Sequence, residues 1–190
     1  MSLLKEFAVD PYYNSDLKRL HSHIDWCIGY FKGEGLIGAR VLDIGSRSPM
    51  TERLEKELNM KVSNTEGDLD VSFYFPFAIY DAIIYSHTIE HQFNPLFTLL
   101  ELRKHLGFIN KDCPVYILLP RRTKMLWVPT HYHEIDNYRF KMLMKRARFK
   151  IISKRYYKSW REWWKYFRGI RPFIRLFIDW NVCYKVKLED

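Results

Sequence analysis

Short apolar runs of strand length alternate with amphipathic segments along this chain of 190 residues. The amphipathic segments have apolar residues three and four positions apart, as helices do, and turn residues separate them from the apolar runs. This alternation favours an α/β fold with a mostly parallel sheet. The predicted strands are 39–44, 60–65, 80–85, 115–119, 149–157 and 180–188, and the predicted helices are 15–31, 49–59, 95–106 and 136–147.

Individual residues set some of the boundaries. Ser48 before Pro49 predicts the start of a helix, because serine caps helices and proline suits the first helical position. Ser15 predicts another helix start. Pro120 is expected to end the fourth strand.

The length of the chain predicts one domain that is long enough to bury a sizeable core. We divide it into an N-terminal helical cap (1–38), a core (39–155), a basic, aromatic helical insertion (156–180) and a last strand (181–190).

The three cysteines lie far apart and form no C-x-x-C pair. Such sparse cysteines are typical of reduced thiols in a cytoplasmic protein. The sequence has neither the pattern of a signal peptide nor a run of about 18 apolar residues. We therefore expect a cytoplasmic location.

The net charge of +9 is concentrated at the C-terminal end. Residues 1–138 contain 15 Lys and Arg against 18 Asp and Glu, whereas residues 139–190 contain 16 against 4. The predicted partners of residues 139–187 are nucleic acid or an anionic membrane, and a solvated basic face is the alternative.

Residues 87–91 have the H-x-x-E-H spacing of one class of zinc proteases. In that class both histidines belong to one helix, but here His87 directly follows a predicted strand and Pro95 limits any helix after His91. A third ligand is also needed, and the segment from His131 to Glu134 supplies no clear one. We therefore expect no metal.

Polar residues follow several of the predicted strands. In an open α/β sheet, ligands bind beyond the carboxyl ends of the strands, so these residues are expected to converge. They are Asp43, Gly45, Ser46, Arg47, Glu66, Ser86, His87, Glu90, His91, Arg121 and Arg122.

Three segments within residues 39–155 resemble class I S-adenosylmethionine-dependent methyltransferases of the small, broad type 11-like group. They are "VLDIGSRSP", "YDAIIYSHTIEHQFNP" and "HYHEIDNYRFKMLMKRARFKII". The resemblance implies a Rossmann-like, mostly parallel sheet with an antiparallel last strand. It also implies S-adenosylmethionine as cofactor.

The resemblance also implies roles for individual residues. The cofactor-binding residues would be Asp43, Gly45, Ser46, Arg47, Glu66 and Ser86. The first four belong to the turn that holds the methionine part, and Glu66 would accept the ribose hydroxyls. His87 is the first candidate for a catalytic base and His131 the second, because imidazole titrates near neutral pH.

Two features depart from the family pattern. Arg47 and Pro49 stand where the pattern has its second and third glycines, and Arg47 would either clamp the cofactor carboxylate or obstruct the pocket. The stretch from Glu66 to Asp81 is too short for a helix and a strand. We therefore expect that helix to be lost and the adenine side of the site to be shortened or open.

The insertion has Trp160, Trp163, Trp164 and Phe167 at helical spacing, with basic residues between them. We expect these four side chains to share one face that covers the edge of the sheet near the acceptor site. The alternatives are ordinary core, a lid, a dimer contact, an interfacial membrane helix and an RNA-binding surface.

The predicted function is methyl transfer from S-adenosylmethionine to a small-molecule or glycan acceptor, with a homodimer as one arrangement. Methyl transfer is a direct displacement, so most of the catalysis is expected from proximity and orientation. The alternative is a non-catalytic, methyltransferase-like binding module for nucleic acid or a membrane surface.

Overall fold

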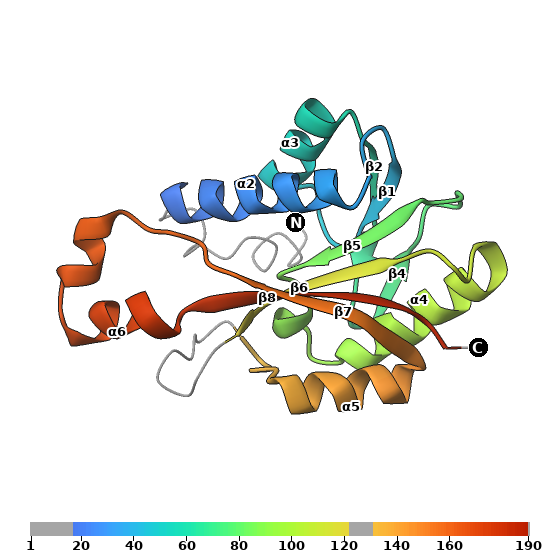
Figure 1. Ribbon diagram of the computed structural model, residues 1–190. Coiled ribbons are helices and arrows are strands. Elements are labelled where there is room, and N and C mark those ends of the chain that lie inside the picture. Colours follow the sequence, from blue (N-terminus) through green and yellow to red (C-terminus); the bar gives the residue numbers. More distant parts are fainter. Residues whose placement is uncertain (1–16, 122–130, 190) are drawn as a thin grey trace, which may run out of the picture.

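The computed structural model describes residues 17–121 and 131–189. Its centre is a six-stranded sheet in the order β2-β1-β5-β6-β8-β7 (Figure 1). The strands are β1 (Arg40–Asp43), β2 (Lys61–Asn64), β5 (Ala82–Ser86), β6 (Val115–Arg121), β7 (Phe149–Tyr157) and β8 (Trp180–Leu188).

The strand directions confirm the predicted fold class. The pairs β1–β2, β1–β5 and β5–β6 are parallel, whereas β8 runs antiparallel to both β6 and β7. The predicted bounds of the last two strands agree with the structure, and the others agree within two residues.

Helices cover both faces of the sheet (Figure 1). On one face lie α2 (Leu17–Gly33) and α3 (Pro49–Leu58), and on the other lie α4 (Pro95–Ile109) and α5 (Asn137–Ala147). Because strand side chains alternate between faces, Val41 and Ile84 pack with the α2–α3 cluster. Leu42 and Ile83 pack with the α4–α5 cluster on the other face.

Side-chain caps explain where the helices begin. Ser48 and Thr51 form a reciprocal capping box at α3, as the serine before Pro49 predicts. Asn94 and Asp136 cap α4 and α5 through their side-chain oxygens. The predicted cap Ser15 lies outside the described residues.

A hairpin replaces the crossover after β2, and the predicted loss of a helix is confirmed. Residues 66–81, all of them described, contain only β3 (Glu66–Asp68) and β4 (Ser72–Tyr74), which pair antiparallel. Gly67 has φ 105°, and a β-carbon there would lie 2.6 Å from the Ser72 carbonyl oxygen. The main sheet therefore ends at β2 on this side.

Pro120 does not end its strand, so that prediction is wrong. β6 continues to Arg121, and Pro120 pairs with Asn181 of β8. The pairing of β5 with β6 ends at Leu118. Pro120 therefore lies where the strand has a partner on one side only, which tolerates a missing amide proton.

The segment between β7 and β8 forms an arm that extends from the end of the sheet (Figure 1). It contains the short 3-10 helix η4 (Trp163–Phe167) and α6 (Ile170–Ile178). Trp160, Trp163, Trp164 and Phe167 are all exposed, Trp163 by 71%. The prediction that these side chains cover the sheet edge is therefore wrong.

The reason is that the arm attaches to α2 rather than to the sheet. The Trp160 amide donates to Ser22 Oγ at 2.9 Å, and ion pairs join Lys18 to Glu162 and Arg19 to Asp179. These contacts hold the base of the arm and leave the four aromatic side chains named above outside the body of the protein.

Two other predictions concern the whole chain. All three cysteines lie within the described residues, where they are buried and free. No helix in the described part of the chain is long and apolar enough to cross a membrane.

Candidate active site

The turn after β1 is organised around the buried carboxylate of Asp43. Thr51 Oγ1 donates to this carboxylate at 2.7 Å, and Asn64 Nδ2 lies 3.4 Å from it. Burial raises the pKa of Asp43 to about 7, although the hydrogen bonds from Thr51 and Asn64 lower it. Asp43 therefore connects the ends of β1 and β2 to the start of α3.

Gly45 has φ 122°, a conformation that side chains rarely allow. Its amide donates to Thr65 Oγ1 at 2.9 Å, and its carbonyl accepts from Asn64 Nδ2 at 3.1 Å. Ser46 follows on the exposed side of the turn. The turn is thus held by side chains from the end of β2.

Arg47 points along α3, where its guanidinium pairs with Glu55. The Arg47 side chain is half exposed. The side chains that contact the Asp43 carboxylate are those of Thr51 and Asn64, not that of Arg47. Its expected contact with the cofactor stays a prediction.

Glu66 lies close to the turn at Gly45 because the residue before it in the chain contacts that turn. It is exposed and directly follows Thr65, whose hydroxyl accepts from the Gly45 amide. It opens β3, so the hairpin fixes its backbone. The structure therefore brings Glu66 to the edge where Gly45 lies, as the topology predicts.

The loop after β5 begins with a strained residue. His87 has φ 51°, in the left-handed region that costs a non-glycine residue about 1–3 kcal/mol. Its amide donates to the Leu118 carbonyl at 2.8 Å, which anchors the loop to β6. Such strain is common at functional sites.

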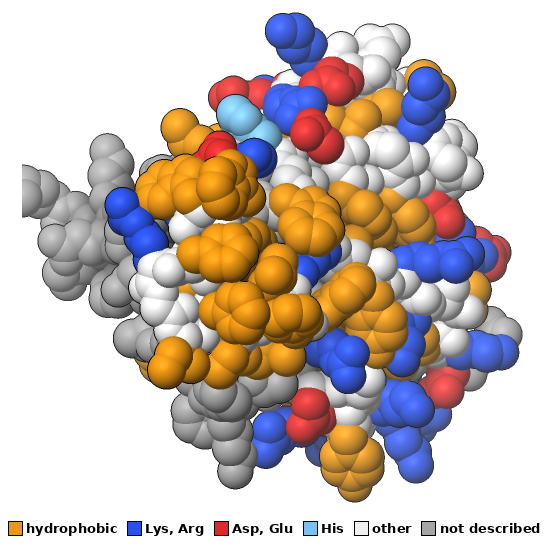
Figure 2. All heavy atoms as spheres, turned by 60° about the vertical axis from the view of Figure 1, so that its left-hand side comes forward, with side chains coloured by type: hydrophobic (Ala, Val, Ile, Leu, Met, Phe, Trp, Pro, Cys, Tyr) orange, Lys and Arg blue, Asp and Glu red, His pale blue; other side chains and the backbone are white. Residues whose placement is uncertain are grey.

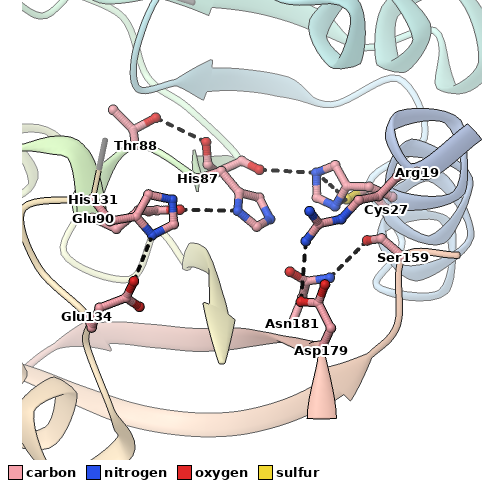
Figure 3. A network of polar contacts seen from close by, with 12 residues as sticks. Arg19, Cys27, His87, Thr88, Glu90, His131, Glu134, Ser159, Asp179 and Asn181 are labelled. Carbon is pink, nitrogen blue, oxygen red and sulfur yellow. Dashed lines mark hydrogen bonds and ion pairs between the residues drawn. The ribbon is translucent and has the colours of Figure 1, made fainter. Parts of the chain in front are cut away.

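The His87 ring lies between two partners. Its Nδ1 is 3.2 Å from Glu90 Oε1 (Figure 3). Its Nε2 is 3.4 Å from the Tyr157 hydroxyl. Burial raises the pKa of Glu90. The hydrogen bond from His87 and the charges of the nearby histidines outweigh this effect, so the pKa of Glu90 falls below its usual value. Glu90 is therefore a buried carboxylate that orients His87.

His23 of α2 joins this cluster, and the sequence interpretation missed it. His23 Nδ1 lies 2.9 Å from the Tyr157 hydroxyl, and Nε2 lies 3.4 Å from Ser86 Oγ. Burial, then the charges of His87 and Arg19, lowers the pKa of His23 well below its usual range. A signal existed, because His23 falls on the apolar face of the predicted helix, three residues after Leu20.

His131 lies on another side of Glu90 from His87. Its Nδ1 is 3.5 Å from Glu134 Oε1 (Figure 3). Its ring stands edge-on to that of His91, with 4.7 Å between the ring centroids. The two predicted catalytic histidines thus belong to adjoining clusters. Whether either takes part in catalysis stays a prediction.

A cavity of about 510 Å³ adjoins the cluster that contains His131 and Glu134. Its size is within the range of small-molecule sites. The residues that line it are Pro95, His131, Tyr132, His133, Glu134, Ile135, Arg139 and Leu143.

No family model matches the sequence, and no curated protein matches it. Solved structures do match. A SAM dependent methyltransferase from Archaeoglobus fulgidus has 15% identity and a TM-score of 0.54, and the match covers 85% of this chain and 94% of that one. The 1,6-didemethyltoxoflavin-N1-methyltransferase of Burkholderia thailandensis, with S-adenosylhomocysteine bound, has 12% identity and a TM-score of 0.56 over 88% and 78%.

The same architecture also occurs in a different kind of enzyme. The [4+2]-cyclase SpnF has 11% identity and a TM-score of 0.57 over 80% of this chain and 76% of that one. At such identities the likeness concerns the fold, and function depends on the site. The chain has the fold of class I S-adenosylmethionine-dependent methyltransferases.

Proposed function

We propose that this protein transfers a methyl group from S-adenosylmethionine to a small-molecule or glycan acceptor. The main support is the contact between the turn after β1 and the loop after β5. A β-carbon on Gly45 would lie 3.4 Å from Thr88 Oγ1, and this hydroxyl lies 3.4 Å from the Ile44 carbonyl. The proposed cofactor turn and the proposed acceptor loop therefore adjoin.

The residues present fit the methionine and ribose parts of the cofactor. Gly45 keeps the turn free of a side chain where the two loops meet, Ser46 offers an exposed hydroxyl, and Glu66 is an exposed acceptor for ribose hydroxyls. The cofactor supplies an electrophilic methyl group on a sulfonium. The β3–β4 hairpin leaves the adenine side shorter than a full crossover does.

His87 would act on the acceptor. A base is needed only where the acceptor must lose a proton, and His87 is the candidate because Glu90 orients its ring. When His87 is neutral with its proton on Nδ1 toward Glu90, its Nε2 is an acceptor toward Tyr157. Tyr157 and His23 then fix the position of that nitrogen.

The cofactor assignment is tested by the melting temperature with S-adenosylhomocysteine. At 100 times its dissociation constant, this product should stabilise the protein by about 2.7 kcal/mol, or roughly 5–10 °C. Gly45→Val should abolish the shift, because valine is strained at that backbone conformation and is larger than the space beside Thr88 allows. Gly29→Ala is the control, since its helix has open space for a β-carbon.

A second variant tests the ribose contact without altering the turn. Glu66→Ala should weaken S-adenosylhomocysteine binding by about 1.5–3 kcal/mol, the loss of a hydrogen bond to a charged group. Glu101→Ala on the surface of α4 should leave the affinity unchanged. No shift for the parent protein at millimolar ligand would refute the enzyme and favour the non-catalytic module.

The exposed arm supports a second role, and we propose that it binds an anionic membrane surface. Figure 2 shows hydrophobic side chains gathered on the face of the protein where the arm lies, with basic side chains around them. A lone soluble domain rarely exposes so large an apolar patch. The exposed apolar residues of the arm are Trp160, Trp163, Trp164, Phe167, Ile170, Phe173 and Phe177.

Charge and side-chain type favour lipid over nucleic acid. Lys158 lies 4.5 Å from the ring of Trp160 and Arg168 lies 4.3 Å from that of Trp164, which is the mixture that interfacial segments have. Ile170 is among the most exposed residues of the arm, and an aliphatic side chain buries in lipid but does not stack on bases.

Sedimentation with phosphatidylserine vesicles tests this role. The parent should bind, and high salt should weaken the binding because the charge term is screened. Trp163→Ala with Phe177→Ala should abolish it, whereas Phe108→Ala, exposed on α4, should not. Binding to RNA but not to vesicles, or self-association through these residues, would refute the membrane role.

A further inference from the structure

Three side chains that bind metals well converge beside the proposed acceptor loop. One ligand atom from each of Glu90, His91 and His131 lies within 4.8 Å of the other two. Glu90 and His91 belong to the 3-10 helix η2 (Ile89–His91) after β5, whereas His131 comes from the segment before α5.

The backbone already holds these two segments together. The His133 amide donates to the Glu90 carbonyl at 3.2 Å, and His133 Nε2 lies 3.1 Å from the Phe93 carbonyl. The approach of His131 to Glu90 therefore does not depend on the flexible side chains alone. A preformed site of this kind spares an ion part of the ordering cost.

Buried polar atoms in this cluster lack hydrogen bonds within the described structure. Glu90 is only 2% exposed, and Oε1 faces His87 while the buried Oε2 has no hydrogen-bond partner among the described residues. His131 Nδ1 and Glu134 Oε1 also have no hydrogen bond there, but they lie 3.5 Å apart and form an ion pair with each other. Leaving an atom such as Glu90 Oε2 unpaired costs about 1–3 kcal/mol, and more for a charged group.

We propose that Glu90, His91 and His131 bind a divalent transition-metal ion of the zinc type. Two imidazoles and one carboxylate suit such ions, whereas Mg²⁺ and Ca²⁺ prefer oxygen ligands. Glu134 lies where a second carboxylate orients a ligand histidine. An ion with bonds of about 2.1 Å places tetrahedral ligands about 3.4 Å apart. Ligand atoms that lie within 4.8 Å of one another must therefore close by up to about 1.4 Å.

The proposed site departs from the sequence expectation of no metal, which stays a prediction until metal binding is measured. The H-x-x-E-H spacing suggests His87 and His91 as the ligand pair, but His87 lies between Glu90 and Tyr157 in a left-handed conformation. The third ligand is His131, and a separation of 40 residues from His91 gives no recognisable spacing. The ion borders the cavity of about 510 Å³ that His131 and Glu134 line.

The test is a metal titration of the full chain, with a readout that does not involve methyl transfer. After chelation and dialysis, the parent should bind one Zn²⁺ or Co²⁺ per chain, its melting temperature should rise, and Mg²⁺ should not compete. The absorption spectrum of the Co²⁺ form should indicate imidazole and carboxylate ligands in low coordination number.

Variants locate the ion. His91→Ala, His131→Ala and Glu90→Gln should each weaken Zn²⁺ binding by about 100-fold or more. The control is His21→Ala, which removes an exposed histidine far along the chain from the trio. It should keep the affinity of the parent.

Glu90→Gln keeps the shape of the side chain, so it remains informative if an alanine variant fails to fold. Failure of the parent to bind Zn²⁺ and Co²⁺, or equal binding by His131→Ala, would overturn the proposal. S-adenosylhomocysteine binding by a metal-free protein would leave the proposed function intact, so the two proposals fail separately.

Discussion

The Tyr157 hydroxyl lies 2.9 Å from His23 Nδ1 and joins the end of β7 to the middle of α2. The same hydroxyl is 3.4 Å from His87 Nε2. A chain of polar contacts thus runs from α2 to the loop after β5. Because α2 packs on the face of the sheet, it also fixes the position of the proposed base.

His23 should make the free energy of unfolding depend on pH. Its lowered pKa keeps it neutral in the folded protein, whereas the unfolded chain protonates it near pH 6.5. Stability is therefore fully present above about pH 6.5 and falls on acidification, by up to about 1.4 kcal/mol per pH unit. Urea denaturation of His23→Gln between pH 7.5 and 5.5 should show a smaller slope than the parent.

The exposed neighbour His21 is the control for this comparison. His21→Gln should keep the slope of the parent, because it removes a surface imidazole of the same helix. An identical slope in the parent and His23→Gln would contradict the buried, neutral state of His23.

Asp43 should have the opposite effect. Burial raises its pKa to about 7, so between about pH 4 and 7 the folded protein holds a proton that the unfolded chain does not. Its contribution is present at low pH and is lost as the pH rises through 7. The stability of Asp43→Asn relative to the parent should therefore increase from pH 5 to pH 8.

Chemical denaturation at several pH values measures this difference directly. Asp25→Asn, which removes an exposed carboxylate paired with Arg53, should show no such increase. A difference between Asp43→Asn and the parent that does not change with pH would show that Asp43 is ionised throughout.

Two left-handed residues should respond differently to glycine. Arg148→Gly should stabilise the protein by about 1 kcal/mol, because Arg148 is the C-cap of α5 with φ 61° and glycine adopts this conformation without strain. His87→Gly relieves similar strain but removes the hydrogen-bond partner of the buried Glu90 carboxylate, which costs about 1.5–3 kcal/mol. Denaturant unfolding should therefore show a net loss for His87→Gly. A gain as large as that of Arg148→Gly would mean that the His87–Glu90 contact is unimportant.

Gly67 should be intolerant of any side chain. Gly67→Ala places a β-carbon 2.6 Å from the Ser72 carbonyl and 2.9 Å from the Phe73 α-carbon, so the hairpin must shift. We expect a loss of at least 1–3 kcal/mol in unfolding free energy. S-adenosylhomocysteine should also bind less tightly, since Glu66 pairs within the same hairpin.

Gly107→Ala provides the matched control, because that position of α4 has open space. It should be neutral or stabilise by about 0.5–1 kcal/mol. Unchanged cofactor affinity in a destabilised Gly67→Ala protein would separate the hairpin from the cofactor site.

Local pattern predicts the sheet well, because strands such as β7 and β8 are specified by their own residues and bounded by turns. The loss of a helix after β2 is also predictable, because the segment of residues 66–81 is too short to form both a helix and a strand. Pro120 misleads because its position in the sheet depends on how far β5 pairs with β6.

The side-chain clusters are not predictable in the same way. His23 and Tyr157 are 134 residues apart, and only the packing of α2 on the sheet brings them together. His131 and Glu90 are 41 residues apart and also meet only in the folded chain. The tryptophans of the arm have the spacing of a buried face, and spacing does not distinguish a covered face from an exposed one.

A crystal structure of the complex with S-adenosylhomocysteine tests the central claim most directly. We predict the methionine part on the turn at Gly45, a ribose hydroxyl bonded to Glu66, and the sulfur facing the loop that begins with Ser86 and His87. A ligand bound away from this edge of the sheet, or no ligand in crystals soaked at saturating concentration, would contradict methyl transfer at this site.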